Sequence, residues 1–294
     1  MPERYEFGRT MSGLALINGD PTAALDTTSC WFTTRTPDGP GTLLLARAFG
    51  GLEATAFGPG ASWLLDRADA IAGLRDDLTG FDELAARHPL VRRLAREHAG
   101  LRMTMTGRVF HHLVPAILGQ KVSGKEAHAG YVRMLRHFAT SPAPGPNTRL
   151  RLPPDPEAVA ATPYWVFHPF GVEQKRADAL RRTAARAVSL ERSADASEAT
   201  RRLTALPGIG PWTAAEVVRV AYGDPDAVSV GDYHLKNIVT FAFTGRPRGD
   251  DAQMLELLEP FAGHRGRVCL LLGAAGIAAP RFGPRMPLRS FARF

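Results

Sequence analysis

The segment LPGIGPWTAAEVV, residues 206–218, constrains the fold of this chain more than any other stretch of its sequence. A helix-forming run ends near Leu206, and a second one begins at Pro211. Between them, Gly208 and Gly210 supply the backbone angles of a tight turn, and proline suits the first turn of a helix. Residues 203–218 therefore predict two helices joined by a short turn. The unpaired amides of this turn and the positive end of the second helix dipole would form a seat for a phosphate.

A second segment, AYGDPDAVSVGDYHLKN, follows at residues 221–237. A turn at 223–226 and an extended run at 227–230 place Asp232 at the start of a further helix. An aspartate at this position is commonly a helix N-cap, and a lone PGxG pattern is commonly an ordinary turn between helices. The two patterns at this spacing favour a functional interpretation of both.

The rest of the chain changes character near residue 60. Short β-prone runs at 29–36, 42–49 and 52–58 are separated by glycine- and proline-containing turns and predict a small antiparallel sheet. From Trp63 onward the apolar spacing is three and four residues, which is typical of helices. The proline-rich run 141–156 predicts a loop. We therefore expect an α+β, mainly α, chain with a β-rich domain over 1–85 and a helical region over 86–294.

Composition narrows the functional classes. The formal net charge of the 294 residues is +7, which suits a polyanionic partner, nucleic acid first of all. Cys30 and Cys269 are far apart, which excludes a disulfide framework and a clustered thiolate site for zinc or iron–sulfur. No basic-then-apolar leader pattern is present, and the longest apolar run, from Val268, is too short to span a bilayer. We expect a cytoplasmic protein with no membrane contact.

These motifs resemble the helix-hairpin-helix (HhH-GPD) DNA glycosylase superfamily. LPGIGPWTA is similar to its hairpin, and VGDYHLKN is similar to the segment, here 227–237, that carries its catalytic aspartate. VPAILGQKVSGKEA (114–127) is similar to the helix and DNA-penetrating loop of the AlkA-type DNA-3-methyladenine glycosylase II, and FGVEQKRADAL (170–180) to another segment of that branch. The resemblance implies two helical subdomains with a small N-terminal antiparallel β domain.

Carried over by position, the resemblance implies that Asp232 is the catalytic carboxylate. Trp212 and Tyr233 match aromatic positions of the base pocket, although either could equally be a core residue. Glu216 stands where that branch has an aromatic ring; it either adds an acid to the pocket or pairs with an arginine on its own helix. Trp165 belongs to an aromatic cluster that packs the core or reaches the pocket.

The resemblance also implies a DNA-contacting surface and a cation site. A lysine follows the loop glutamine and would be a poorer wedge than leucine in the gap left by a flipped base. Backbone carbonyls of the hairpin could hold a structural Na+ or K+, and no other cofactor is required. The expected DNA contacts are Gln120, Lys121, Ser123, Pro207, Gly208, Ile209 and Gly210, and the cation would bind the carbonyls of Thr204, Leu206 and Ile209.

The expected activity is that of a monofunctional DNA N-glycosylase of base-excision repair. Such an enzyme flips and hydrolytically releases damaged, alkylated bases from double-stranded DNA and leaves an abasic site. Superfamily members that also cut the strand carry a lysine two residues after the second hairpin glycine, where this chain has Trp212. The alternatives are a non-catalytic protein that binds DNA or recognises damage with the same hairpin, and a bifunctional lyase. We expect a monomer associated with the nucleoid of a bacterial cytoplasm.

Overall fold

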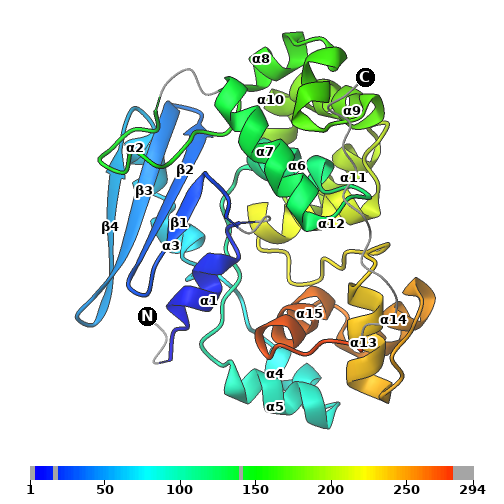
Figure 1. Ribbon diagram of the computed structural model, residues 1–294. Helices are drawn as coiled ribbons and strands as arrows, with labels where there is room; N and C mark the ends of the chain where they lie inside the picture. The colour runs from blue at the N-terminus through cyan, green and yellow to red at the C-terminus, as the bar shows by residue number, and fades with distance from the viewer. Residues whose placement is uncertain (1–3, 16–18, 139–141, 281–294) are drawn as a thin grey trace.

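The computed structural model describes residues 4–15, 19–138 and 142–280. Three large apolar cores organise these residues (Figure 1). One core lies against a small sheet, the second lies inside an upper group of helices, and the third lies inside a lower group. This is the mainly α architecture that the sequence predicts.

The N-terminal sheet has four antiparallel strands in the order β1-β2-β3-β4. Two-residue loops join the last three strands, because Thr36 pairs with Gly39 and Ala48 pairs with Gly51. Inward side chains of β2 and β3 share one core with α1, α2 and α3. The bounds are α1 (Phe7–Ser12), β1 (Ala23–Leu25), β2 (Ser29–Thr36), β3 (Gly39–Ala48), β4 (Gly51–Phe57), α2 (Ala61–Leu65) and α3 (Ala68–Ile71).

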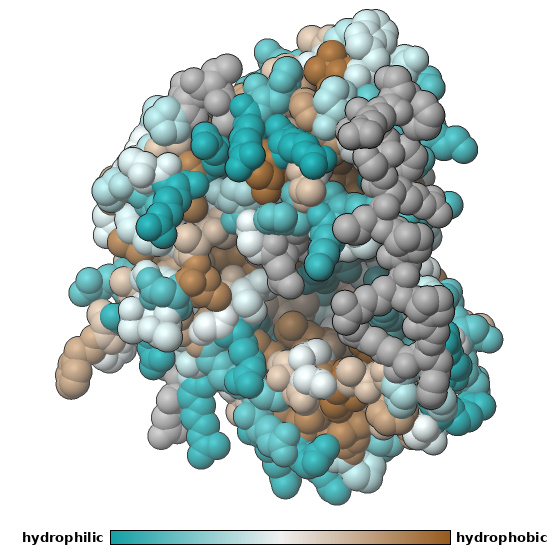
Figure 2. All heavy atoms as spheres, viewed as in Figure 1, coloured by the Kyte–Doolittle hydropathy of each residue, from teal (hydrophilic) through white to brown (hydrophobic). Residues whose placement is uncertain are grey.

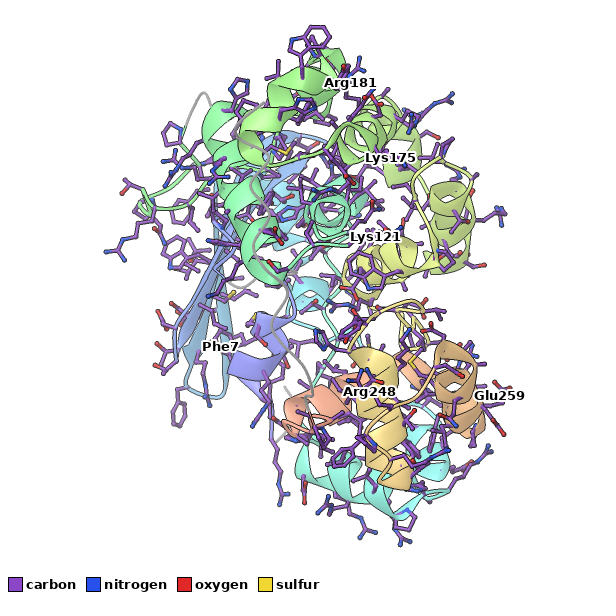
Figure 3. The ribbon with its side chains drawn as sticks, turned by 45° about the vertical axis from the view of Figure 1, so that its right-hand side comes forward. Phe7, Lys121, Lys175, Arg181, Arg248 and Glu259 are labelled. Atoms are coloured by element: carbon purple, nitrogen blue, oxygen red, sulfur yellow. The ribbon has the colours of Figure 1, made fainter. Side chains whose placement is uncertain are left out.

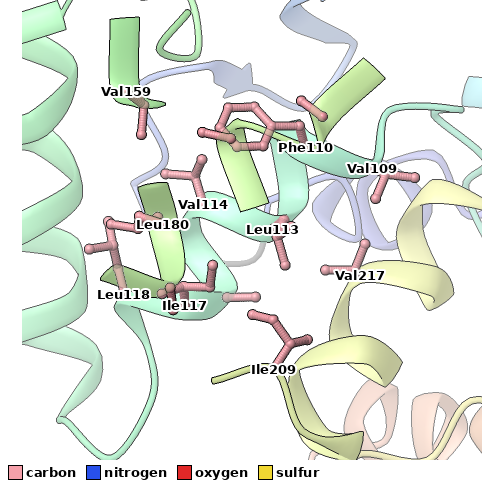
Figure 4. Close-up of a cluster of buried hydrophobic side chains, with 14 of the residues drawn as sticks. Val109, Phe110, Leu113, Val114, Ile117, Leu118, Val159, Leu180, Ile209 and Val217 are labelled. Atoms are coloured by element: carbon pink, nitrogen blue, oxygen red, sulfur yellow. The ribbon is translucent and has the colours of Figure 1, made fainter. Parts of the chain in front are cut away.

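The upper group of helices is built around α6, in which all ten residues are buried. Its sequence, VFHHLVPAIL, is apolar on nearly every side, which is typical of a helix enclosed by others. Figure 4 shows its side chains among those of neighbouring helices. The bounds are α6 (Val109–Leu118), α7 (Gly124–Phe138), α8 (Pro156–Ala161), η1 (Tyr164–Phe170), α9 (Gln174–Ala184), α10 (Ala187–Glu191), α11 (Ala196–Thr204) and α12 (Pro211–Ala221).

The lower group combines helices from both ends of the helical region. Arg267 of α15 forms a buried bidentate ion pair with Asp76, in the connection that leads from α3 to α4. On the face shown in Figure 2, apolar residues gather over the lower group, while hydrophilic residues are more frequent over the upper one. The bounds are α4 (Phe81–Ala85), α5 (Pro89–Glu97), α13 (Leu235–Thr244), α14 (Asp251–Leu258), η2 (Glu259–Phe261) and α15 (Arg265–Ala274).

The predicted elements lie close to the observed ones. The strands expected at 29–36, 42–49 and 52–58 correspond to β2, β3 and β4, whereas β1 was not predicted. Residues 142–155 contain no helix or strand, as expected for the proline-rich run. The boundary expected at 85/86 passes between α4 and α5, which share the lower core. Within the described ranges, no helix is both long and apolar enough to cross a lipid bilayer.

Candidate active site

The turn between α11 and α12 has the tight backbone that its glycines predict. Gly208 has a φ of +93°, an angle that residues with a Cβ rarely adopt. A Cβ at this position would also lie 3.0 Å from the Cβ of Ala179 on α9. Glycine therefore allows the turn to lie directly against α9.

Two amides of this turn are free to bind a ligand. In the described part of the chain, the N–H groups of Gly208 and Gly210 have no hydrogen-bond acceptor. Gly210 is the N-cap of α12, so its amide lies at the positive end of the helix dipole. Ile209, only 5% exposed, projects from the turn into the upper core (Figure 4) and fixes the amides in place. This geometry can hold a phosphate without contacting a base.

The loop between α6 and α7 is hydrogen-bonded to this turn. Gln120 Nε2 donates to the carbonyl of Gly208 at 3.0 Å and to Thr213 Oγ1 at 2.9 Å. Lys121 follows, exposed, with a φ of +55°; no other non-glycine residue in the described ranges has a positive φ. In Figure 3, Lys121 and Lys175 extend from the upper helical group and Arg248 from the lower one. Gln120 thus makes the loop and the turn one structural unit.

Ser123 directly precedes α7 and is engaged in a capping box. Its amide and hydroxyl both donate to Glu126 Oε2, at 2.8 and 2.7 Å, and its Oγ accepts from the amide of Glu126 at 3.3 Å. This reciprocal pattern stabilises a helix N-terminus. The hydroxyl therefore has a structural role in the chain, and its contact with DNA stays a prediction.

Asp232 lies three residues before Leu235, the first residue of α13, and also contacts the start of α12. Its Oδ1 accepts from the amides of His234, the N-cap of α13, and of Leu235, at 2.7 and 2.8 Å, so the carboxylate stabilises this helix end as a capping side chain does. Its Oδ2 accepts from Trp212 Nε1 at 3.2 Å. The carboxylate is thus both a cap and the neighbour of the hairpin, so the structural and functional interpretations of this residue are compatible.

Solved structures share the overall fold of this chain, although no family model and no curated protein matches it. A 3-methyladenine DNA glycosylase from Archaeoglobus fulgidus aligns over 91% of this chain and 93% of its own, with a TM-score of 0.73 and 16% identity. The chain has the helix-hairpin-helix DNA glycosylase fold.

Two further structures show the same fold. An 8-oxoguanine glycosylase/lyase from Clostridium acetobutylicum, in complex with DNA, aligns over 86% of this chain and 97% of its own, with a TM-score of 0.62 and 13% identity. A DNA-3-methyladenine glycosidase from Bacillus halodurans aligns over 67% and 88%, with a TM-score of 0.50 and 25% identity. The fold therefore occurs in glycosylases that differ in the base they release and in lyase activity.

Within this glycosylase fold, the expected pocket residues do not all lie together. Trp212 is partly buried against Asp232, and the neighbouring Tyr233 is 64% exposed with its ring edge-on to His234. Trp165 is 60% exposed on η1, which packs on α7 and α9 at the far end of the upper group. No contact in the described ranges joins Trp165 to the carboxylate, so its role in the pocket stays a prediction.

Glu216 lies one helical turn after Trp212 on α12. Its Oε2 accepts from Arg219 at 2.9 Å, and its Oε1 accepts from the hydroxyl of Ser229. The ion pair on its own helix, one of the two alternatives for this residue, is therefore present. Ser229 is 6% exposed and precedes Asp232 by three residues. Glu216 is thus connected to the segment that carries the carboxylate.

Asp251, which lies near Asp232, was missed from the sequence. Asp251 Oδ1 accepts from the amide of Gly231 at 2.9 Å, and its Oδ2 accepts from Lys236 Nζ at 3.0 Å. Burial raises the pKa of Asp251, but its hydrogen bonds with Gly231 and Lys236 outweigh burial and hold the pKa below its usual value. In the sequence, the Asp250–Asp251 pair indicates a helix N-terminus. It does not reveal that Asp251 contacts the segment of Gly231 and Lys236.

Arg176, in the segment FGVEQKRADAL (170–180), is also a structural residue of this site. It is 5% exposed and donates to the carbonyls of Leu118 at 2.8 Å and Gly171 at 3.2 Å. Burial lowers the pKa of Arg176, and the nearby Glu173 opposes that shift. The guanidinium therefore holds the end of α6, from which the loop of Gln120 begins.

Two further expected site residues, Pro207 and Leu206, lie on the hairpin. Pro207 is exposed at the turn, and the Leu206 carbonyl, one of the three expected cation ligands, accepts from the amide of Ile209 at 3.0 Å. Asp232 does not line either of two surface cavities in the described part of the chain. One is lined by residues that include Asp77 and Tyr222, and the other by residues that include His88.

Proposed function

We propose that this protein is a monofunctional DNA N-glycosylase of base-excision repair, which releases damaged, alkylated bases from double-stranded DNA and leaves an abasic site. The observation that carries the proposal is the hydrogen bond between Trp212 Nε1 and Asp232 Oδ2. It places a carboxylate beside a turn whose free amides suit a phosphate. A nucleotide whose phosphate binds at Gly208 and Gly210 would therefore have its sugar near that carboxylate.

Asp232 would act on the glycosidic bond of an extruded nucleotide. As the bond between C1′ and the base nitrogen breaks, the base leaves with the electron pair and positive charge develops on the deoxyribose. A fixed carboxylate stabilises this charge and orients a water molecule, whose oxygen bonds to C1′ while its proton passes to solvent or to the carboxylate. An alkylated, cationic base leaves without a dedicated acid, which agrees with a site built around one carboxylate.

The lysines support hydrolysis without strand cleavage. A lyase needs an unprotonated lysine to form a Schiff base with the sugar. Trp212 occupies the hairpin position at which strand-cutting relatives carry that lysine. Lys236, four residues after Asp232, is ion-paired with Asp251 at 3.0 Å, which engages its Nζ in a contact within the protein. We infer that neither position supplies a nucleophile.

The hairpin would bind the DNA backbone, with Pro207 and Ile209 beside the two amides. Gln120 and Lys121 would enter the duplex or contact its phosphates from the adjoining loop. A Na+ or K+ at the carbonyls of Thr204, Leu206 and Ile209 would add a positive charge beside the phosphate. A tighter binding of duplex DNA in K+ or Na+ than in a bulky organic cation at equal ionic strength would support that site.

Base release by Asp232→Asn tests the proposal. Asparagine caps a helix about as well as aspartate, so this variant should fold normally. We expect release of alkylated bases, scored as alkali-labile abasic sites, to fall at least about 100-fold. Asp195→Asn, at the N-cap of α11, is the matched control and should retain full activity.

Three other results would change the proposal. Undiminished release by Asp232→Asn would remove that residue from the chemistry. No release by the wild type from any lesion in a broad panel, with intact binding, would favour the non-catalytic damage-binding protein. Covalent trapping to DNA by borohydride would show a lyase.

A further inference from the structure

The segment that carries Asp232 is a loop whose shape depends on side chains from other elements. Residues 227–234 lie between α12 and α13 and form no helix or strand. Gly231, directly before Asp232, has a φ of +93°. Glycine has no Cβ, so this residue by itself does little to fix the conformation of the loop. A carboxylate that stabilises developing charge needs a fixed position, because a misplacement of about 1 Å can cost about 100-fold in rate.

Glu216 is connected to this carboxylate through Ser229. The buried hydroxyl of Ser229 donates to Glu216 Oε1, and the carbonyl of Ser229 accepts from the amide of Asp232 at 3.0 Å. Glu216 and Trp212 are four residues apart on α12, so they lie on the same face of the helix. One helix face therefore holds the loop at two points: at Ser229 through Glu216, and at Asp232 through Trp212.

Glu216 is itself held in place by two donors of the chain. Arg219 donates to its Oε2 at 2.9 Å, and the side chain of Glu216 is only 18% exposed. Each of its oxygens therefore has a donor from the chain. An ion pair between partly exposed side chains adds little stability, whereas losing the acceptor would leave the Ser229 hydroxyl buried without a partner.

We propose that Glu216 is a positioning residue for Asp232, which it holds through Ser229. The inference rests on the proposed glycosylase function. It explains why an acid can stand where the AlkA-type resemblance places an aromatic ring: the side chain orders the catalytic loop instead of stacking on a base. The residue acts on the rate of bond cleavage and not on the binding of DNA, since the phosphate seat lies at Gly208 and Gly210.

Single-turnover base release and DNA affinity separate this role from a general one. Glu216→Ala and Ser229→Ala should each lower the rate about 10- to 100-fold while the Kd for an abasic-site duplex changes less than about twofold. The double variant should be no slower than either single one, because both remove the same connection. Glu216→Gln keeps an acceptor for Ser229 and should recover most of the rate. Glu97→Ala, which removes the exposed Arg93–Glu97 ion pair on α5, is the matched control.

Hydrogen exchange gives a readout that does not depend on activity. The amides of residues 227–235 should exchange at least about tenfold faster in Glu216→Ala than in the wild type or in Glu97→Ala. Unchanged exchange there, an unchanged rate, or additive losses in the double variant would overturn the positioning role. Failure of the proposed function would appear differently: the wild type would release no base, while the exchange difference would persist.

Discussion

Replacing Trp212 with phenylalanine removes one hydrogen-bond donor from the carboxylate of Asp232 and keeps an aromatic ring at the start of α12. Trp212 Nε1 lies 3.2 Å from Oδ2, whereas Oδ1 keeps the amides of His234 and Leu235. The variant should therefore retain the cap of α13 and lose the connection between the carboxylate and the hairpin. We expect a loss of rate without a loss of fold.

The size of this effect follows from the strength of the hydrogen bond. A hydrogen bond to a charged group contributes about 1.5–3 kcal/mol net. At 3.2 Å and partly exposed, this one belongs at the lower end, about 1.5–2 kcal/mol. Since about 1.4 kcal/mol corresponds to tenfold in rate, Trp212→Phe should release an alkylated base about 10- to 30-fold more slowly in a single-turnover assay.

A matched tryptophan provides the control. Trp63, which stacks against the Arg67 guanidinium at 4.3 Å, lies beside the sheet, and Trp63→Phe should leave the rate unchanged. The Kd for an abasic-site duplex should stay within about twofold in both variants, because neither touches the amides of Gly208 and Gly210. A Trp212→Phe rate within twofold of the wild type, or an affinity that falls as much as the rate, would refute the reasoning.

Three further outcomes are expected. Gln120→Ala should weaken binding to an abasic-site duplex about tenfold in a titration at fixed salt, because it disconnects the loop from the hairpin. Arg267→Ala should lower the free energy of unfolding in urea by about 3–5 kcal/mol, because Asp76 would remain buried without its partner. Burial lowers the pKa of His111 to about 3 and that of His112 far below its usual value. Only the unfolded state then binds these protons, so stability should fall as pH drops from about 6.5 towards 3, and less steeply in His111→Gln/His112→Gln.

The fold could be predicted where local chemistry decides it. The turn after α11 requires Gly208, and a proline at the next helix start fixes where α12 begins, so both boundaries were visible in the sequence. The strand β1 was not, because Ala23–Leu25 is short and lacks β-branched or aromatic residues. It forms a strand because it pairs with β2, a contact that no local pattern encodes.

The sequence predicted which residues of the candidate site to consider, but it did not predict which residues they contact. Asp232 was placed at a helix start by the turn and the extended run before it, and the structure has it there. The partner of Glu216 could not be chosen, because Ser229 and Arg219 are both available in the sequence and the fold brings both to it. Gln120 meets Gly208 across 88 positions, a contact that depends on the packing of α6 against α12.

One helix, α12, joins the proposed phosphate seat to the carboxylate of Asp232. The N-terminus of α12 contributes the seat, its first turn contributes Trp212, and its second turn contributes Glu216. Its opposite face is buried in the upper core, where Val217 packs among the side chains around α6 (Figure 4). Because α12 is a rigid element with a rise of about 5.4 Å per turn, its geometry would set the distance between Asp232 and a phosphate bound at the proposed seat. Phosphate binding and base release therefore both depend on how α12 packs against the upper core. A substitution that shifts α12 should lower both, whereas a substitution at Trp212 or Glu216 should lower base release alone.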